Sequence, residues 1–120
     1  NIVLIGDALH TAHFSIGSGT RLAIEDAIAL TKALEAETEI SAGLARYQAE
    51  RKPIVQKLVT AARTSADWYE RFGEHMELGL MDFAYSYITR SGRIADARLR
   101  AMSPEFMARY EAEKRIGGPT

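Results

Sequence analysis

The stretch NIVLIGDALHTAHFSIGSGTRLAIEDAIALT, residues 1–31, decides the fold, because it runs from an apolar segment through a glycine-containing loop into a helical pattern. Residues 1–5 contain a continuous β-favouring apolar run, which is typical of a strand buried on both faces. Gly6 and Asp7 follow directly. Open α/β sheets bind their ligands at the carboxyl ends of their strands. The pattern therefore predicts an N-terminal buried strand with Asp7 at a ligand-binding edge.

The loop after this segment contains Gly17 and Gly19, which lack a Cβ and so let the backbone bend and approach a bound molecule closely. From Thr20 onward apolar residues recur at helical spacing and form one face, made up of Leu22, Ala23, Ala27, Leu30 and Leu34. A helix that begins directly after glycines presents unpaired N–H groups and the positive end of its dipole. We therefore expect this loop to bind an anion or a developing negative charge.

Two motifs in the first half of the chain carry a family resemblance. The first comprises Gly6-Asp7-Ala8, His10, Gly17-x-Gly19 and Glu25-Asp26-Ala27, and the second is Tyr47-Gln-Ala-Glu50-Arg51-Lys52-Pro53. In this order and spacing they resemble the flavin fingerprint and the Tyr-x-x-Glu-Arg-Arg-Pro segment of FAD-dependent aromatic hydroxylases, the para-hydroxybenzoate hydroxylase-like flavoprotein monooxygenases.

The chain departs from that family pattern at three positions. Phe14 stands where the family usually has Pro, Ser18 where it often has Gln, and Arg21 where it usually has Asn. These departures indicate a subfamily with a different substrate. The remainder, from Trp68 to Tyr110, resembles the branch that hydroxylates aromatic acyl-CoA thioesters such as salicylyl-CoA.

The resemblance implies FAD as cofactor, NAD(P)H as co-substrate, and hydroxylation of an aromatic substrate through a C4a-hydroperoxyflavin formed with O2. It implies cofactor contacts at Asp7, Gly17, Ser18, Gly19, Thr20 and Arg21. Asp7 would accept hydrogen bonds from the ribityl hydroxyls, and the amides of 17–20 would face the pyrimidine edge of the flavin. His13 and Phe14 would line the substrate pocket. No side chain is assigned a catalytic role, because the chemistry belongs mainly to the cofactor.

Other interpretations of the same residues stay open. Asp7, His10 and His13 could be read as metal ligands, but the loop does not obviously bring these three into the geometry a metal needs, so we predict no metal. A flavoenzyme of the same fold could instead be an epoxidase, a halogenase or a dehydrogenase. The chain could also be a non-enzymatic interaction module whose helical seam from Leu44 to Phe72 pairs with a partner.

The composition narrows the function classes further. The 120 residues amount to one domain at most, and the net charge of −1 argues against nucleic-acid binding. There is no cysteine for a disulfide, a thiolate metal site or a thiol nucleophile. No apolar run approaches the length of a membrane span. We expect a soluble, cytoplasmic protein that does not bind membranes.

The second half of the sequence predicts a helical region. A long amphipathic helix is expected from an N-cap at Ser41 to about Phe72, with a kink or a break at Pro53. Further helices are expected over about 76–90, 94–102 and 104–114, with residues 117–119 fraying the end.

The expected fold class is α/β, as part of an FAD-binding Rossmann-like monooxygenase, although the 120 residues themselves should be mainly α with one strand. Residues 1–38 would end the FAD-binding domain, and residues 39–120 would pack on it as a helical region that shapes the pocket or a homodimer contact. A lone buried strand needs sheet partners, so we expect the missing N-terminal part of the same chain to supply them. Without that part, the 120 residues should neither bind FAD tightly nor turn over.

Overall fold

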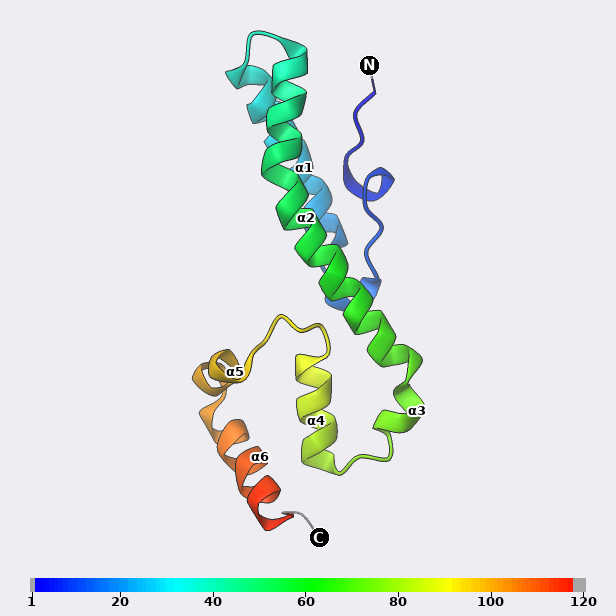
Figure 1. Ribbon diagram of the computed structural model, residues 1–120, viewed down its shortest axis with the longest axis vertical. Coiled ribbons are helices and arrows are strands. Elements are labelled where there is room, and N and C mark those ends of the chain that lie inside the picture. The colour runs from blue at the N-terminus through cyan, green and yellow to red at the C-terminus, as the bar shows by residue number, and fades with distance from the viewer. Residues whose placement is uncertain (1, 118–120) are drawn as a thin grey trace. The chain divides into compact units, whose positions relative to one another are not determined.

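The computed structural model describes residues 2–117, and these divide into two compact units between Ala66 and Asp67. The described part of the chain is mainly helical (Figure 1). Two 3-10 turns come first, η1 (Gly6–Ala8) and η2 (Phe14–Ile16), and the α-helices follow as α1 (Gly19–Ala36), α2 (Ile40–Glu70), α3 (Phe72–His75), α4 (Leu80–Thr89), α5 (Asp96–Met102) and α6 (Pro104–Ile116). None of these helices is both long and apolar enough to cross a bilayer.

In the first unit, α1 and the N-terminal part of α2 lie side by side and are joined by a short turn (Figure 1). Gly43 of α2 allows this close approach, because a Cβ there would lie 2.9 Å from Leu34 Cδ2 and 3.2 Å from the Ala33 carbonyl oxygen. The core between the elements consists of small and medium apolar side chains, namely Leu22, Ala33, Tyr47, Val55, Leu58, Ala61 and Ala62. The helical spacing that the sequence showed after Thr20 is confirmed by α1, which begins one residue earlier.

The prediction of a buried N-terminal strand is wrong for this structure. Residues 2–5 form no strand, and Ile2 is 89% exposed. The backbone of Ile5 is extended (φ −137°, ψ 159°), so the conformation favoured by an apolar run is present locally. Residues 2–117 contain no second strand for it to pair with. A strand requires inter-strand hydrogen bonds, and an extended segment without them stays irregular. Asn1 lies outside the described residues.

Helix α2 continues through Pro53, so the break predicted near Arg51 to Pro53 does not occur, while the alternative of a kink stays a prediction. A proline removes one backbone hydrogen bond and costs a helix interior about 3 kcal/mol. Arg51 and Val55, on either side of Pro53, are both buried in the first unit and hold the helix on both sides of the proline. Packing therefore outweighs the local penalty. The helix begins at Ile40, one residue before the N-cap predicted at Ser41.

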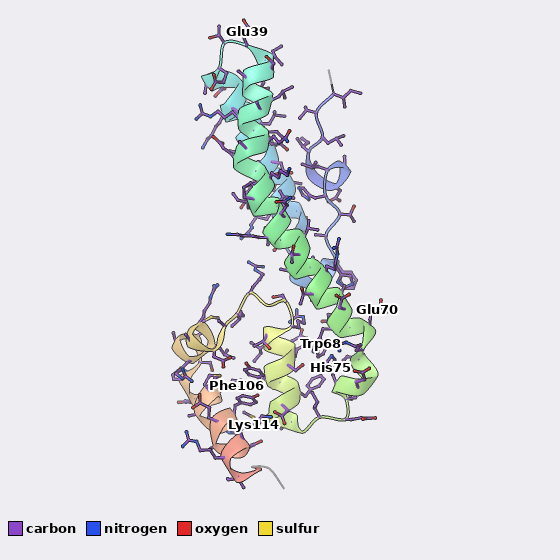
Figure 2. The ribbon with its side chains drawn as sticks, viewed as in Figure 1. Glu39, Trp68, Glu70, His75, Phe106 and Lys114 are labelled. Carbon is purple, nitrogen blue, oxygen red and sulfur yellow. The ribbon has the colours of Figure 1, made fainter. Side chains whose placement is uncertain are left out.

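The second unit is organised around Trp68, the only tryptophan of the chain. Its ring stacks on that of His75 with centroids 4.4 Å apart and lies edge-on to Tyr87 at 5.6 Å. Figure 2 labels Trp68 and His75, whose side chains lie close together. The indole Nε1–H donates a hydrogen bond of 2.7 Å to Ser86 Oγ on α4. Helix α6 packs on both α4 and α5. Of the aromatic residues in the predicted seam, Tyr47 and Trp68 are buried core residues, whereas Phe72 is 43% exposed.

The helix boundaries in this unit differ slightly from the predicted ones. The expected helix over 76–90 is shortened to α4, because the short helix α3 and a turn precede it. Gly92 follows the end of α4 with φ +69°, a left-handed conformation that favours glycine. Helix α6 begins at Pro104 as predicted and ends at Ile116. Of the segment predicted to fray, Gly118 and Pro119 lie outside the described residues. The predicted division of the chain at residue 38 stays a prediction.

Candidate functional site

A pocket of about 470 Å³ lies at the N-terminus of α1. The residues that line it come from three neighbouring parts of the chain: the η1 turn, the following loop, and the first turn of α1. They are Asp7, Ala12, Phe14, Gly17, Ser18, Gly19, Thr20 and Ala23. The structure therefore brings together six residues that the sequence singled out: Asp7, Phe14 and the four residues 17–20.

The backbone of this pocket has the features of an anion site. Gly17 has φ +62°, a left-handed conformation that L side chains rarely adopt. A Cβ on Gly17 or Gly19 would meet no atom within 4 Å, so open space lies beside this backbone. Ser18 precedes the helix but its side chain makes no capping bond, and instead donates to the Ile16 carbonyl at 3.2 Å. The amides of the first turn of this 18-residue helix thus have no capping side chain.

Charge in the pocket comes from two sources of opposite sign. The helix N-terminus carries a partial positive charge, equivalent to roughly half an elementary charge. The Asp7 carboxylate is exposed on the η1 turn, where it can accept hydrogen bonds from a ligand. The pocket can therefore bind an electron-rich group at the amides and a hydroxyl-bearing group at Asp7.

A buried carboxylate, Asp26, holds the segment that carries Asp7 onto the two helices. Its side chain is fully buried on α1 and accepts hydrogen bonds from three donors. The Gly6 amide donates at 2.9 Å and His10 Nε2 at 2.6 Å, both to Oδ2, while Arg51 Nε donates to Oδ1 at 2.8 Å. The Tyr47 hydroxyl adds a bond of 3.2 Å to the Leu4 carbonyl. Residues 4–10 are therefore fixed by side chains from both α1 and α2.

This network keeps Asp26 ionised. Burial alone raises the pKa of the carboxyl, but the hydrogen bonds from Gly6, His10 and Arg51 outweigh burial and lower the pKa below its ordinary value. Gly6 is also required sterically, since its φ is +59° and a Cβ would lie 3.1 Å from the Ala23 Cβ. The Gly-Asp turn is thus positioned by contacts in which Asp7 itself takes no part.

A second set of hydrogen bonds fixes the loop that bears Phe14. His13 Nδ1 lies 2.7 Å from Ser15 Oγ and accepts from the Ser15 amide at 3.3 Å. Ser15 Oγ lies 2.6 Å from Oγ of Ser65, a fully buried residue of α2. The His13 ring stacks on Phe14 with centroids 4.5 Å apart. The loop is therefore tied to the interior of the first unit.

Two of the predicted site residues do not line the pocket. Arg21 is exposed on α1, where its Nε lies 3.4 Å from Glu25 Oε1. His13 reaches the pocket only through its stacking on Phe14. Of the three residues considered as metal ligands, His10 contacts Asp26 and His13 contacts Ser15. Residues 2–117 contain no group of three acidic or histidine side chains that could hold a metal.

Sequence reasoning named Asp26, Arg51 and His10 as motif residues but missed that they contact one another. A signal was available, because Asp26 lies four residues after Leu22 on the apolar side of its helix, and Arg51 lies within the apolar seam of α2. Two opposite charges on two buried helix faces indicate a buried ion pair. No comparable signal pointed to Ser15 and Ser65.

Comparison with known proteins agrees with this geometry. Residues 1–62 match the family described as FAD binding domain. A salicyloyl-CoA 5-hydroxylase from a Streptomyces species is 45% identical over 92 residues, covering 74% of this chain and 18% of the relative. A 3-hydroxy-4-methyl-anthranilyl-(aryl-carrier protein) 5-monooxygenase from Streptosporangium sibiricum is 49% identical over 96 residues, covering 79% of this chain and 26% of that protein.

A third relative, the protodeoxyviolaceinate monooxygenase of Chromobacterium violaceum, is 38% identical over 103 residues, with 86% of this chain and 26% of the relative covered. The chain thus spans between 18% and 26% of the length of these relatives. The family match extends over more than half of the chain and includes the pocket and the Asp26 network. With its uncapped helix N-terminus, its Gly-Asp turn and this match, the chain belongs to the FAD binding domain family, whose larger fold is α/β.

Proposed function

We propose that this chain is part of an FAD-dependent aromatic monooxygenase and that the pocket at the N-terminus of α1 receives the flavin. The observation that carries the proposal is the pocket itself, because Asp7 and the backbone of 17–20 line one cavity. These residues fit a flavin: glycines leave room beside the backbone, uncapped amides suit an electron-rich ring edge, and a carboxylate suits a polyol chain.

Each residue has a separate task in this proposal. The amides of Gly19 and Thr20 donate hydrogen bonds to the pyrimidine edge, and the α1 dipole stabilises negative charge there by about 0.3–1 kcal/mol. Asp7 would accept hydrogen bonds from the ribityl hydroxyls and so hold the ribityl group of FAD in the pocket. Phe14 forms the apolar wall that excludes water on the substrate side. When bound, reduced FAD supplies the activation of O2 with which the aromatic ring is hydroxylated.

We further propose that the substrate is an aromatic acyl-CoA thioester and that NAD(P)H is the reductant. Support comes from the two Streptomyces and Streptosporangium relatives, whose names pair an aromatic acyl group with CoA or with an aryl-carrier protein. Phe14, at a position where the resembled family has Pro, offers this ring an aromatic surface. The same proposal includes the domain boundary predicted from the sequence, with residues 1–38 in the FAD-binding domain and residues 39–120 packing on it.

The flavin role is tested by replacing Asp7 with alanine in the full-length protein. Hydrogen bonds to a charged group contribute about 1.5–3 kcal/mol, so we expect FAD affinity to fall about tenfold or more. The measurement is the FAD dissociation constant, obtained by titrating apoprotein with FAD. Glu39→Ala, an exposed carboxylate in the turn between α1 and α2, is the matched control and should leave the constant unchanged. Unchanged FAD affinity in a folded Asp7→Ala protein would remove Asp7 from the site.

The substrate class is tested on the same preparation. With NAD(P)H, O2 and salicyloyl-CoA, the wild-type protein should release a thioester that carries one additional ring hydroxyl. Release of an epoxide, or of a chlorinated thioester when chloride is supplied, would instead assign the chain to another chemistry on the same fold.

A further inference from the structure

The hydroxyl of Ser65 is unusual because it is fully buried on α2 and yet contacts a loop residue, Ser15, which lies 50 residues earlier in the chain. It lies 2.6 Å from Ser15 Oγ, which in turn lies 2.7 Å from His13 Nδ1. This series of contacts ends at the stacked pair His13 and Phe14. It therefore connects the interior of the first unit to the wall of the flavin pocket.

The direction of these hydrogen bonds follows from the one donor that cannot be reversed. The Ser15 amide donates to His13 Nδ1, so Nδ1 is an acceptor and the ring hydrogen lies on Nε2. The Ser15 hydroxyl must then donate to the same Nδ1. Its oxygen is left to accept the hydrogen of Ser65. In this arrangement the two hydrogen bonds that Ser15 donates to Nδ1 hold the plane of the His13 ring.

Fixing the His13 ring also fixes Phe14. Phe14 is 87% exposed and lines the pocket, so little besides its stacking on His13, with an interplanar angle of 27°, restricts its side chain. An exposed aromatic ring loses conformational freedom when it binds a second ring. A ring that is already held in place loses less conformational freedom on binding than a mobile one.

We propose that Ser65, acting through Ser15 and His13, is a positioning residue that holds Phe14 as a preorganised stacking surface for the aromatic ring of the substrate. The proposal rests on the proposed function, since it assumes that the pocket holds flavin and an aromatic acyl group. Phe14 makes the contact with substrate. Ser65 sets its orientation and touches neither ligand.

A double-mutant cycle in the full-length flavoprotein tests this proposal. The variants are Phe14→Ala, Ser65→Ala and the two combined, and the readouts are the KM for salicyloyl-CoA and the fraction of NAD(P)H consumption that yields hydroxylated product. We expect Phe14→Ala to raise KM about tenfold, from the lost ring contact. We expect Ser65→Ala to raise it about threefold and to lower the coupled fraction. In the Phe14→Ala background, removing the Ser65 hydroxyl should change neither quantity.

Controls separate positioning from general stability. Thr64, the exposed neighbour of Ser65, donates only to the Thr60 carbonyl of its own helix at 3.0 Å, so Thr64→Ala should match wild type. Ser15→Ala should act like Ser65→Ala and serves in its place if that variant does not fold. Ser15→Thr retains the hydroxyl and should restore normal KM.

The outcomes are distinct. A Ser65→Ala effect of the same size with and without Phe14 would overturn the positioning role, as would an unchanged KM in Phe14→Ala. Failure of the wild-type holoprotein to bind salicyloyl-CoA saturably would also count against the stacking surface. Loss of FAD from the wild-type protein would instead contradict the proposed function, and FAD content is therefore measured for every variant.

Discussion

Replacing Asp26 with alanine is expected to destabilise the first unit by about 3–5 kcal/mol, because it leaves buried donors without their common acceptor. The Gly6 amide, His10 and Arg51 all donate to this one carboxylate. Arg51 would be left with only a 3.4 Å contact to the half-exposed Glu25. Since the network also holds the Gly-Asp turn, FAD affinity should fall together with stability.

The free energy of unfolding of the full-length protein, from denaturant titration, measures the first effect. Glu25→Ala is the matched control. It removes the adjacent carboxylate on the same helix, whose contact with Arg51 is partly exposed and should contribute about 0–1 kcal/mol. An Asp26→Ala effect no larger than about 0–1 kcal/mol, the size expected for Glu25→Ala, would show that the Asp26 network does not stabilise the protein.

The same carboxylate predicts a pH dependence with a definite sign. Because the folded state lowers the pKa of Asp26, its contribution is fully present above the unfolded pKa of about 4. The contribution is lost as the pH falls through the lower folded value. The difference in unfolding free energy between wild type and Asp26→Asn should therefore be large above about pH 4 and shrink below it. A difference that grows on acidification would contradict the lowered pKa.

Replacing Trp68 with alanine is expected to lower the free energy of unfolding of the second unit by about 3–5 kcal/mol. The side chain is 5% exposed and lies at the centre of an aromatic cluster that includes Phe72, His75, Phe83 and Tyr87. Its removal leaves a cavity that the helices around it cannot fill by small shifts, and it leaves the Ser86 hydroxyl without the indole donor.

Amide hydrogen exchange of α4 in the full-length protein measures this local effect. Trp68→Phe keeps an aromatic ring but removes the Nε1–H donor, and should cost about 1–2 kcal/mol. Protection of α4 in Trp68→Ala within about 1 kcal/mol of wild type would show that the cluster does not hold the second unit together.

The features that could be predicted from the sequence are those with a local cause. Helix α1 follows from its apolar spacing and begins after Gly17 and Ser18, at Gly19, because the loop glycines end the preceding irregular segment. The buried face of α2 follows from steps of three and four residues, and includes Tyr47, Arg51 and Leu58. The lining of the pocket by residues 17–20 could be predicted because these residues are contiguous at the start of α1, whereas Asp7 was assigned to the same site by the order of the motifs.

The remaining features depend on partners that are distant in sequence. A strand at residues 2–5 needs another strand, which residues 6–117 do not contain. The contacts of Asp26 join residues 16 to 25 positions apart, and the contact between Ser15 and Ser65 joins residues 50 apart. A local pattern indicates at most that Asp26 and Arg51 both lie on buried helix faces. It carries no information about the contacts of Asp26 with Gly6 and His10, or about the pair Ser15 and Ser65. Pro53 is the opposite case. The proline by itself predicts that the helix breaks, but packing on both sides of Pro53 keeps α2 continuous.

The central claim is that the N-terminus of α1 binds the flavin, and amide hydrogen exchange tests it most directly. Exchange is measured on the full-length protein with and without FAD. If the amides of Gly19, Thr20 and Arg21 donate to the flavin or lie beneath it, FAD should slow their exchange markedly more than that of the remote turn at Glu39. Equal exchange rates at these three amides in the two states, in a protein that demonstrably binds FAD, would place the flavin elsewhere and contradict the account.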